Sequence, residues 1–386
     1  MVQRVCLVSG GTGGHLLPAL VLARALRERG HEPLLVTEGR EVEREILRRE
    51  LPLVTEVSLP VAHGSRLGLP WWLARATVAA RHLLQEQGVD SVISTGGRPS
   101  VPVGFAARSL GVPLFLLEQN AVTGRANRLL APFARRIYHG LPAAAARGPR
   151  SLVTGTPLRP EFRRIDRRLC REVLGLEANV PVVLVTGGSQ GAHVLNEVVP
   201  AALVAVARNL QVLHLSGIGR DEPVRRLYAS GEGKVCARVR PIAIDMDRMF
   251  GAADLVVCRG GGTTVAELAA SGRPAVIVPY PHHRDQQQLR NAEILARVGA
   301  AIVVEEAALT RDGLADLLAG LLADGPRLEA MGRAAAALRP VDPIRTILGD
   351  MGVDRGGVDG RGADEGARGG AAVAAVDPAQ GAGGAR

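Results

Sequence analysis

Four glycine-rich stretches have the composition of phosphate-binding loops, and each follows a short apolar run. They read "GGTGGH" (10–15), "STGGRPS" (94–100), "GGSQGA" (187–192) and "CRGGGTTVAE" (258–267). Where such a loop joins a strand to a helix, glycine lets an anion approach the free backbone amides at the positive end of the helix dipole. A single loop of this kind would be explained by a tight turn. Four of them predict a ligand cleft at the carboxyl ends of parallel strands, between two domains.

The spacing of the glycines excludes two common nucleotide motifs. A dinucleotide fingerprint counted from Gly11 would need a glycine where Leu16 stands. A P-loop would need a Gly-Lys-Ser/Thr sequence, and the only lysine of the chain is Lys234. The loops therefore predict anion binding of another kind.

Two ionisable side chains beside the loops are candidates for chemistry. His15 stands where the first loop becomes a helix, and an imidazole there can serve as a general base facing the cleft, although a lone histidine is more often packed or capping. We favour the functional interpretation of His15. Glu267 has two interpretations of equal weight. It can complete a capping box with Thr264, or accept hydrogen bonds from both hydroxyls of a ribose.

Side-chain amides cluster in "DQQQLRN" (285–291), where a helix is expected to start. Amides both donate and accept hydrogen bonds, which suits sugar hydroxyls; the alternative is a solvated polar first turn. His282 and His283 stand beside Asp285, but no third group lies at ligand spacing. We therefore expect no metal site and no other cofactor.

The elements that would position these residues alternate between short apolar strands and amphipathic helices, which predicts an α/β fold with parallel sheets buried on both faces. The pattern starts twice, because "VCLVSGGTGGH" (5–15) aligns with "VVLVTGGSQGA" (182–192). We predict two doubly wound domains, at residues 1–158 and 159–340. From about Asp350 the chain is mostly Gly, Ala, Asp and Arg, which predicts a disordered tail.

The amino-acid composition limits the classes of binding partner that can be expected. The net charge of +9 suits phosphorylated substrates or an anionic membrane surface, and no interleaving of aromatic and basic residues supports nucleic acid binding. The four cysteines are far apart in the sequence, so neither a disulfide framework nor a zinc site is expected. The sequence has no signal-peptide pattern and no long uncharged apolar run, so any membrane contact is expected to be peripheral.

Several separate stretches together resemble one family. They are "GGTGGHLLPALVLARAL", "LEQNAVTGRANRLLAPFA", "TGTPLRPEF", "VTGGSQGAHVLN", "DLVVCRGGGTTVAELAASGRPAVIVPYP" and "DQQQLRNAEIL". The chain resembles the MurG family, the N-acetylglucosaminyltransferases of glycosyltransferase family 28. The resemblance spans about residues 4–340 and implies a GT-B fold, in which two Rossmann-like domains face a cleft and the last helix crosses back to the first domain.

The resemblance implies inverting transfer of N-acetylglucosamine (GlcNAc) from UDP-GlcNAc to the 4-hydroxyl of undecaprenyl-pyrophosphoryl-N-acetylmuramoyl-pentapeptide (lipid I), giving lipid II and UDP for peptidoglycan. His15 would be the catalytic residue, as general base or polariser of the attacking hydroxyl. The residues implied to bind the donor are Thr12, Gly13, Gly14, Asn120, Arg159, Ser189, Ala243, Thr263, Thr264, Glu267, Gln287, Gln288 and Asn291. Those implied to hold the acceptor diphosphate are Gly10, Gly11, Gly96 and Gly97.

The stretch "LGLPWWLARATVAARHLL" (67–84) gains a meaning from this resemblance. Leu69, Trp71, Trp72 and Leu73, with arginines beside them, suit an apolar patch at a membrane interface. A core helix is the alternative for one of the tryptophans, because neighbours on a helix cannot both face inward. The family also implies attachment to the cytoplasmic face of the bacterial cell membrane, roles in cell shape and division, and leaves a cell-wall or division complex open as a partner.

The sequence departs from the family at a few positions. Arg98 stands where the family usually has tyrosine, Thr156 stands where it usually has asparagine, and "CRGGGTT" carries an extra glycine. The alternatives to the implied function are a related GT-B transferase acting on another lipid such as diacylglycerol, a UDP-GlcNAc 2-epimerase, and a non-catalytic binding protein. The presence of "GGTGGH" and "EQN" argues against the first, and His15 argues against the last.

Overall fold

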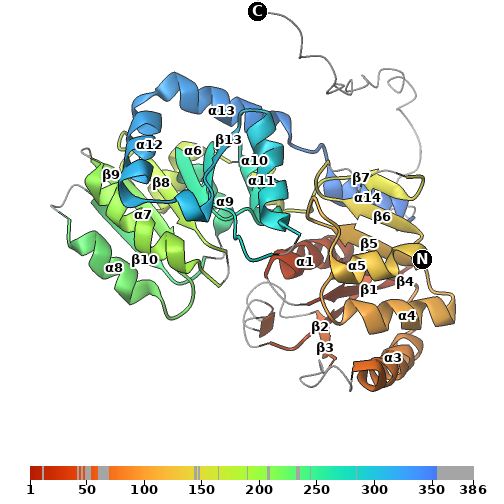
Figure 1. The fold of residues 1–386 in the computed structure, drawn as a ribbon. Helices are drawn as coiled ribbons and strands as arrows, with labels where there is room; N and C mark the ends of the chain where they lie inside the picture. The colour runs from red at the N-terminus through yellow and green to blue at the C-terminus, as the bar shows by residue number, and fades with distance from the viewer. Residues whose placement is uncertain are drawn as a thin grey trace, which may run out of the picture.

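The computed structural model describes residues 1–10, 13–40, 43–44, 47, 54–59, 69–142, 146, 148–163, 165–188, 190–206, 209–231, 235–243, 245–283 and 285–353. Within them the chain builds two parallel β-sheets, each covered by helices on both faces (Figure 1). The predicted α/β class with two doubly wound sheets is confirmed.

The first sheet has seven parallel strands, and its order reverses between β1 and β4. In sheet order the strands are β3 (Thr55–Ser58), β2 (Glu32–Thr37), β1 (Arg4–Ser9), β4 (Ser91–Gly96), β5 (Leu114–Glu118), β6 (Arg136–His139) and β7 (Ser151–Val153). Its helical segments are α1 (Gly13–Glu28), α3 (Leu69–Glu86), α4 (Ser100–Leu110), α5 (Arg125–Leu130) and the 3-10 turn η2 (Ala131–Phe133). An open α/β sheet binds ligands where its strand order reverses, so the ends of β1 and β4 are the place to look.

The second sheet has six parallel strands and reverses between β8 and β11. In sheet order they are β10 (Val235–Arg240), β9 (Leu210–Leu215), β8 (Val182–Thr186), β11 (Leu255–Cys258), β12 (Ala275–Ile277) and β13 (Ala301–Val303). The helical segments between residues 160 and 337 are η4 (Pro160–Arg163), α6 (Arg167–Val173), α7 (His193–Ala205), α8 (Asp221–Ala229), α9 (Met246–Ala252), α10 (Gly262–Ser271), α11 (Gln287–Arg297), η5 (Glu306–Ala308), α12 (Arg311–Ala323) and α13 (Gly325–Ala337). The last helix is α14 (Pro343–Asp350).

Strand periodicity explains why both sheets are covered on both faces. Alternate residues of β1 enter opposite layers: Val5 and Leu7 pack with α1 and α14, whereas Cys6 and Val8 pack with α3, α4 and α5. The central strand β8 is buried along its whole length. Such uninterrupted burial accounts for the continuous apolar runs in the sequence.

The last helix, α14, leaves the second sheet and packs on the first (Figure 1). Ile347 and Leu348 are buried in the same cluster as residues of β1 and α1. At its end, the Asp350 carboxylate accepts hydrogen bonds from Tyr138 (2.8 Å) and Arg136 (3.0 Å) on β6. Val353, just beyond α14, is buried in this cluster; residues 354–386, on which the predicted disordered tail falls, lie outside the described residues.

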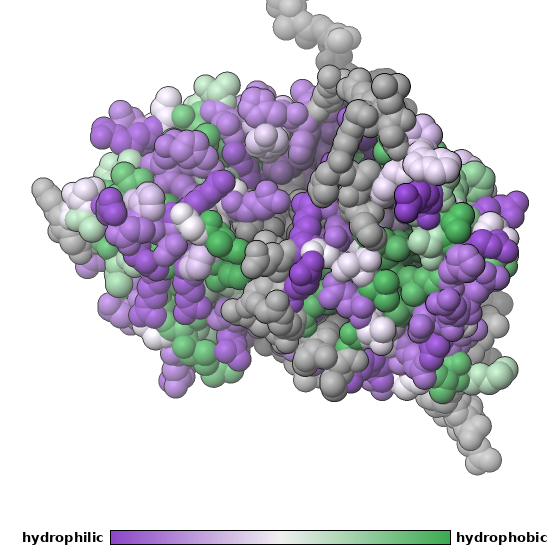
Figure 2. All heavy atoms as spheres, turned by 90° about the horizontal axis from the view of Figure 1, so that it is seen from below, coloured by the Kyte–Doolittle hydropathy of each residue, from purple (hydrophilic) through white to green (hydrophobic). Residues whose placement is uncertain are grey.

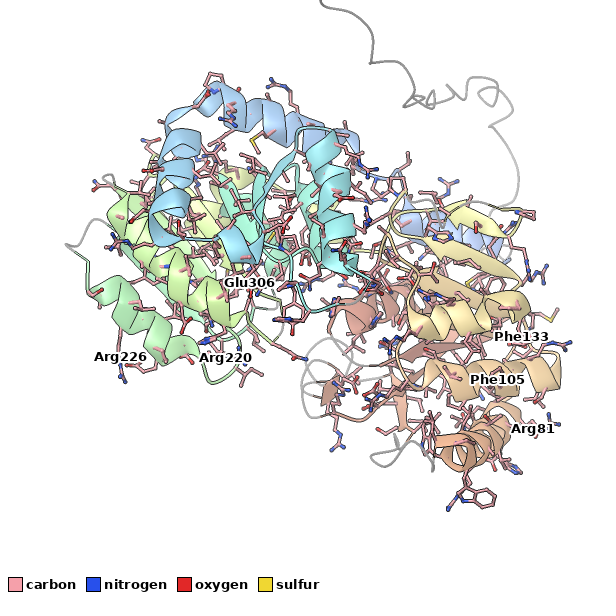
Figure 3. All side chains as sticks on the ribbon, viewed as in Figure 1. Arg81, Phe105, Phe133, Arg220, Arg226 and Glu306 are labelled. Atoms are coloured by element: carbon pink, nitrogen blue, oxygen red, sulfur yellow. The ribbon has the colours of Figure 1, made fainter. Side chains whose placement is uncertain are left out.

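The surface on the side of the molecule that carries α3 has mixed hydropathy. Figure 2 shows hydrophobic residues there in separate groups among hydrophilic ones. Trp71 on α3 is 70% exposed and Leu69 is 53% exposed, while Trp72 and Leu73 are half-buried. Nearby, Phe105 of α4 meets Phe133 of η2 edge to face, with ring centroids 5.9 Å apart (Figure 3). Among the described residues, no helix is long and apolar enough to cross a membrane.

Candidate functional site

A cavity of about 350 Å³ lies between the two sheets, at the carboxyl ends of their strands. The first domain contributes the start of α1 and the residues after β5; the second contributes the loops after β8, β10 and β11 and the start of α11. Each of the four glycine stretches begins at the carboxyl end of a strand, as predicted. The cavity therefore occupies the crevice that both sheet topologies single out.

His15 is held at the cavity by a backbone carbonyl. It lies in the first turn of α1, and its Nδ1 is 2.7 Å from the carbonyl oxygen of Thr95 at the end of β4. Because a carbonyl only accepts, Nδ1 carries the proton, and in the neutral ring Nε2 then bears the lone pair. A histidine anchored in this way has the tautomer that a general base requires.

Glu267 faces the cavity from α10 with only 5% of its surface exposed. The capping-box interpretation is wrong, because α10 has Gly261 as its N-cap without a side-chain cap, and Thr264 lies inside the helix. Burial raises the pKa of Glu267 to about 8, although the positive charge of Arg159 acts in the opposite direction. A buried carboxyl with this pKa, aimed into a cavity, is typical of a binding or catalytic group.

Asn291 joins the two domains instead of lining the cavity. Its Oδ1 accepts from the backbone N–H of Ala121 (2.7 Å), and its Nδ2 donates to Asn120 Oδ1 (3.0 Å) and to the Gly260 carbonyl (2.9 Å). Its side chain is fully buried, so in this arrangement both amide protons and the oxygen are engaged. Thr263 adds a further contact across the domains by donating to the Gly14 carbonyl (3.0 Å).

The first two glycine loops are packed against each other. Gly10 donates its N–H to the Gly96 carbonyl (3.1 Å), and Gly97, at φ +95°, lies so close that a Cβ on it would be 2.3 Å from the Gly10 oxygen. A Cβ on Gly96 would lie 3.0 Å from the imidazole of His15. Gly10, Gly96 and Gly97 are thus absent from the lining of the cavity, although Gly96 adjoins the ring of His15.

The predicted site residues fall into three groups. Those that line the cavity are Gly14, His15, Asn120, Arg159, Ala243, Thr263, Thr264, Glu267, Gln287 and Gln288. Those described but absent from its lining are Gly10, Gly96, Gly97 and Asn291. Gly13 is the first residue of α1. Gly11, Thr12 and Ser189 lie outside the described residues. Of the three departures from the family, Arg98 is exposed and Thr156 is buried beside Gly140, away from this lining. The third is the extra glycine of "CRGGGTT", where Gly261 and Gly262 line the cavity.

Gln119 and Arg259 also line the cavity, although the sequence pattern did not single them out. Gln119 donates to the Thr95 carbonyl (3.1 Å), the same oxygen that anchors His15. Arg259 is 8% exposed, pairs with Glu306 and lies over the ring of Tyr280. Its place directly before the glycines of the fourth loop was the available signal. No group of three or more metal-ligating side chains occurs among the described residues.

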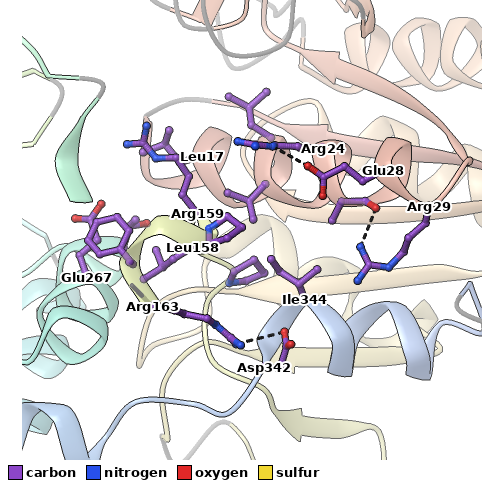
Figure 4. Close-up of a pocket in the computed structure, with 17 residues that line it drawn as sticks. Leu17, Arg24, Glu28, Arg29, Leu158, Arg159, Arg163, Glu267, Asp342 and Ile344 are labelled. Atoms are coloured by element: carbon purple, nitrogen blue, oxygen red, sulfur yellow. Dashed lines mark hydrogen bonds and ion pairs between the residues drawn. The ribbon is translucent and has the colours of Figure 1, made fainter. Parts of the chain in front are cut away.

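A second cavity of about 200 Å³ lies behind Arg159 and Glu267, between α1 and the two segments that connect the domains (Figure 4). Ion pairs span it: Arg24 with Glu161 (3.6 Å) and Arg163 with Asp342 (3.3 Å). These side chains are a third to a half exposed, and such pairs contribute little to stability. The buried amide contacts of Asn291 therefore carry more of the domain contact than the ion pairs do.

Both halves of the chain match domains of one known protein family. The glycosyltransferase family 28 N-terminal domain matches residues 5–139, and the glycosyltransferase family 28 C-terminal domain matches residues 182–345. The chain is 41% identical over 363 residues to the UDP-N-acetylglucosamine–N-acetylmuramyl-(pentapeptide) pyrophosphoryl-undecaprenol N-acetylglucosamine transferase of Halorhodospira halophila (strain DSM 244 / SL1), which covers 91% of this chain and 99% of that protein.

Two further comparisons agree. The protein of the same name from Ectopseudomonas mendocina (strain ymp) is 39% identical over 355 residues, covering 90% of this chain and 98% of that one. The crystal structure of Acinetobacter baumannii MurG superposes with a TM-score of 0.74 at 28% identity, covering 91% of this chain and 99% of that one.

We predict that Asn291→Ala opens the domains. The substitution leaves the Ala121 N–H and the Asn120 amide without partners in a buried contact, and each such loss costs about 1–3 kcal/mol. Small-angle X-ray scattering should give a larger radius of gyration than for the wild type. Arg290→Ala, at the exposed neighbouring position of α11, is the control and should scatter like the wild type. Equal radii for all three proteins would contradict the prediction.

Proposed function

The chain belongs to glycosyltransferase family 28, and on this premise we propose that it transfers GlcNAc from UDP-GlcNAc to the 4-hydroxyl of the N-acetylmuramoyl group of lipid I, giving lipid II and UDP in peptidoglycan synthesis. The observation that carries the proposal is the likeness, over nine-tenths of the chain, to transferases of that name at 39% and 41% identity. The cavity supports it, because it unites a carbonyl-anchored histidine with a buried carboxylate from the other domain.

We propose that the second domain binds the donor. Glu267 would accept hydrogen bonds from the two ribose hydroxyls, and the backbone at Ala243 would meet the uracil. The loops that hold Ser189, Thr263 and Thr264 would bind the diphosphate through their amides, with charge from Arg159. The GlcNAc would lie near Gln287, Gln288 and Asn120, with Thr12, Gly13 and Gly14 close to it. Asn291 belongs to this sugar group as a prediction, although here it contacts Asn120.

We propose that His15 takes the proton of the attacking hydroxyl. Nε2 would accept the proton of the muramoyl 4-hydroxyl while that oxygen forms a bond to the anomeric carbon and the bond to UDP breaks, which inverts the carbon. Loop amides and the N-terminus of α10 would stabilise the charge on the departing UDP. Gly10, Gly11, Gly96 and Gly97 would hold the acceptor diphosphate beside His15, in keeping with the closeness of Gly96 to its ring.

We propose that the first domain, residues 1–158, takes the acceptor and the membrane, and that residues 159–340 take the donor. Leu69, Trp71, Trp72 and Leu73 on α3 would enter the acyl boundary of the cytoplasmic face of the cell membrane. Exposure of Leu69 and Trp71 supports this part, and the apolar pair Phe105 and Phe133 lies on the neighbouring elements. Roles in cell shape and division, and membership of a cell-wall complex, would follow from the product.

We predict that His15→Ala lowers kcat by about 10²- to 10⁴-fold, the usual contribution of a general base, while UDP-GlcNAc still binds. The assay is transfer of labelled GlcNAc to a short-chain lipid I analogue, with diacylglycerol and no acceptor as controls. His82→Ala, on the exposed side of α3, is the matched histidine variant and should keep its rate. Transfer to diacylglycerol instead would overturn the acceptor, and an unchanged rate in His15→Ala would make His15 structural.

The affinity for UDP-GlcNAc should rise with pH. Because the pKa of Glu267 is raised to about 8 by burial, most of the free protein at pH 7 holds it protonated, whereas a carboxylate that accepts from both ribose hydroxyls is ionised. Calorimetric Kd values should fall between pH 6 and pH 8 by up to about tenfold per unit and level off above that. Glu267→Gln should bind more weakly and without this slope. A flat wild-type profile would refute the assigned ionisation.

Vesicle binding should depend on Trp71. We expect Trp71→Ser to weaken sedimentation with vesicles of anionic phospholipid by several-fold, because a 70% exposed indole is removed from the interface. Ile218→Ser removes a 56% exposed apolar side chain from the second domain and should bind like the wild type. If both variants bind as the wild type does, α3 is not the attachment site.

A further inference from the structure

A chain of buried side-chain hydrogen bonds crosses the second domain behind the cavity. Tyr228 on α8 lies 2.9 Å from Nδ1 of His214 on β9, and Nε2 of His214 lies 3.0 Å from Oδ1 of Asn196 on α7. Asn196 Nδ2 then donates to the backbone carbonyl of Ser216 (2.9 Å). None of these residues is more than 6% exposed, and none lines the described part of the cavity.

The direction of the chain follows from its two ends. Since Asn196 donates through Nδ2 to a carbonyl, its Oδ1 is the acceptor, so Nε2 of His214 carries the proton. Nδ1 is then left to accept from the hydroxyl of Tyr228. Burial lowers the pKa of His214 to about 3, which keeps the ring neutral and this single arrangement in place.

The chain ties together two loops that touch. Asn196 lies in the first turn of α7, directly after the glycine loop at 187–191, and Ser216 starts the loop that follows β9. A Cβ on Gly191 would lie 1.9 Å from the Ser216 carbonyl oxygen, and a Cβ on Gly217 would lie 2.7 Å from the Gln190 oxygen. The two backbones therefore interlock, and a shift of one moves the other.

A third segment is joined to this pair. Ser216 donates its N–H to the Arg240 carbonyl (3.0 Å), and Gly217 donates to the Pro241 carbonyl (2.9 Å) at the end of β10. The cavity lining includes Gly187, Gly188 and Gln190 of the glycine loop after β8, Leu215 at the end of β9, and residues 241–243. Three segments of the second domain that line the cavity thus come together around Ser216, whose carbonyl accepts the hydrogen bond from Asn196.

We propose that His214 is a positioning residue for the donor site: through Asn196 it holds the diphosphate loop at 187–191 in register with the segments at 215–217 and 241–243. The inference rests on the proposed function, because that function makes this loop the receptor of the donor diphosphate. Loop amides bind a diphosphate well only when they are held in place beforehand, and a displacement of about 1 Å can cost on the order of 10²-fold. His214 never touches substrate.

The test compares His214→Leu with His214→Gln. Leucine removes the donor to Asn196, whereas the glutamine amide reaches the position of Nε2 and keeps it. We expect His214→Leu to raise the calorimetric Kd and the KM for UDP-GlcNAc by about tenfold, with kcat at saturating donor and KM for the lipid I analogue within twofold of the wild type. His214→Gln should restore most of the donor affinity.

Gln211→Leu is the matched control for lost stability. Gln211 is as buried, lies on the same strand, and exchanges hydrogen bonds with the backbone of Glu177 at the end of β9 away from the cavity. The Gln211→Leu substitution should lower the melting temperature without changing the KM for UDP-GlcNAc. If His214→Leu does not fold, Tyr228→Phe is measured instead. This substitution removes the hydroxyl that donates to Nδ1 of His214 and should raise the KM for UDP-GlcNAc about threefold, less than the tenfold rise expected for His214→Leu.

Each outcome separates the two claims. Unchanged donor Kd and KM in the folded variants, or an equal rise in Gln211→Leu, would overturn the positioning role while transfer by the wild type upholds the proposed function. A wild type that neither binds UDP-GlcNAc nor transfers GlcNAc would overturn the proposed function, and this inference with it.

Discussion

The shape of the cavity depends on the amide of Asn291, because it is a buried point at which the two domains meet. It contacts the segment after β5 of the first domain and the loop after β11 of the second through three hydrogen bonds. Leaving a buried amide without hydrogen-bond partners costs more free energy than breaking a surface ion pair, so this contact sets how far the sheets lie apart. His15 and Glu267, 252 positions apart in the chain, line one cavity as a result.

Backbone dipoles supply most of the positive character that the glycine loops offer. Helix N-termini at α1, α7 and α10 all point toward the crevice from the carboxyl ends of their strands, and glycine keeps their amides accessible. Such dipoles are useful only when they are rigid. The interlocked loops at Gly191 and Gly217, and the packed pair at Gly10 and Gly97, provide that rigidity through contacts that no larger residue would permit.

Burial decides the chemistry of the ionisable groups more than charge pairing does. Glu267 and His214 are both buried, and desolvation shifts both toward their neutral forms, which raises one pKa and lowers the other. The consequences differ because of where the groups face. Glu267 faces a cavity that a polar ligand can fill, whereas His214 has permanent partners in Asn196 and Tyr228 and serves as a fixed link.

The sequence by itself determined the α/β class, the strands that lead into the four glycine loops and the place of each loop, because apolar periodicity and turn chemistry act over a few neighbouring residues. It also singled out His15 and Glu267. It left the capping box at Thr264 open and did not show that Asn291 contacts the other domain. Only the tertiary structure decided these points, since each depends on which distant segment removes water from the side chain, and local pattern carries no such information.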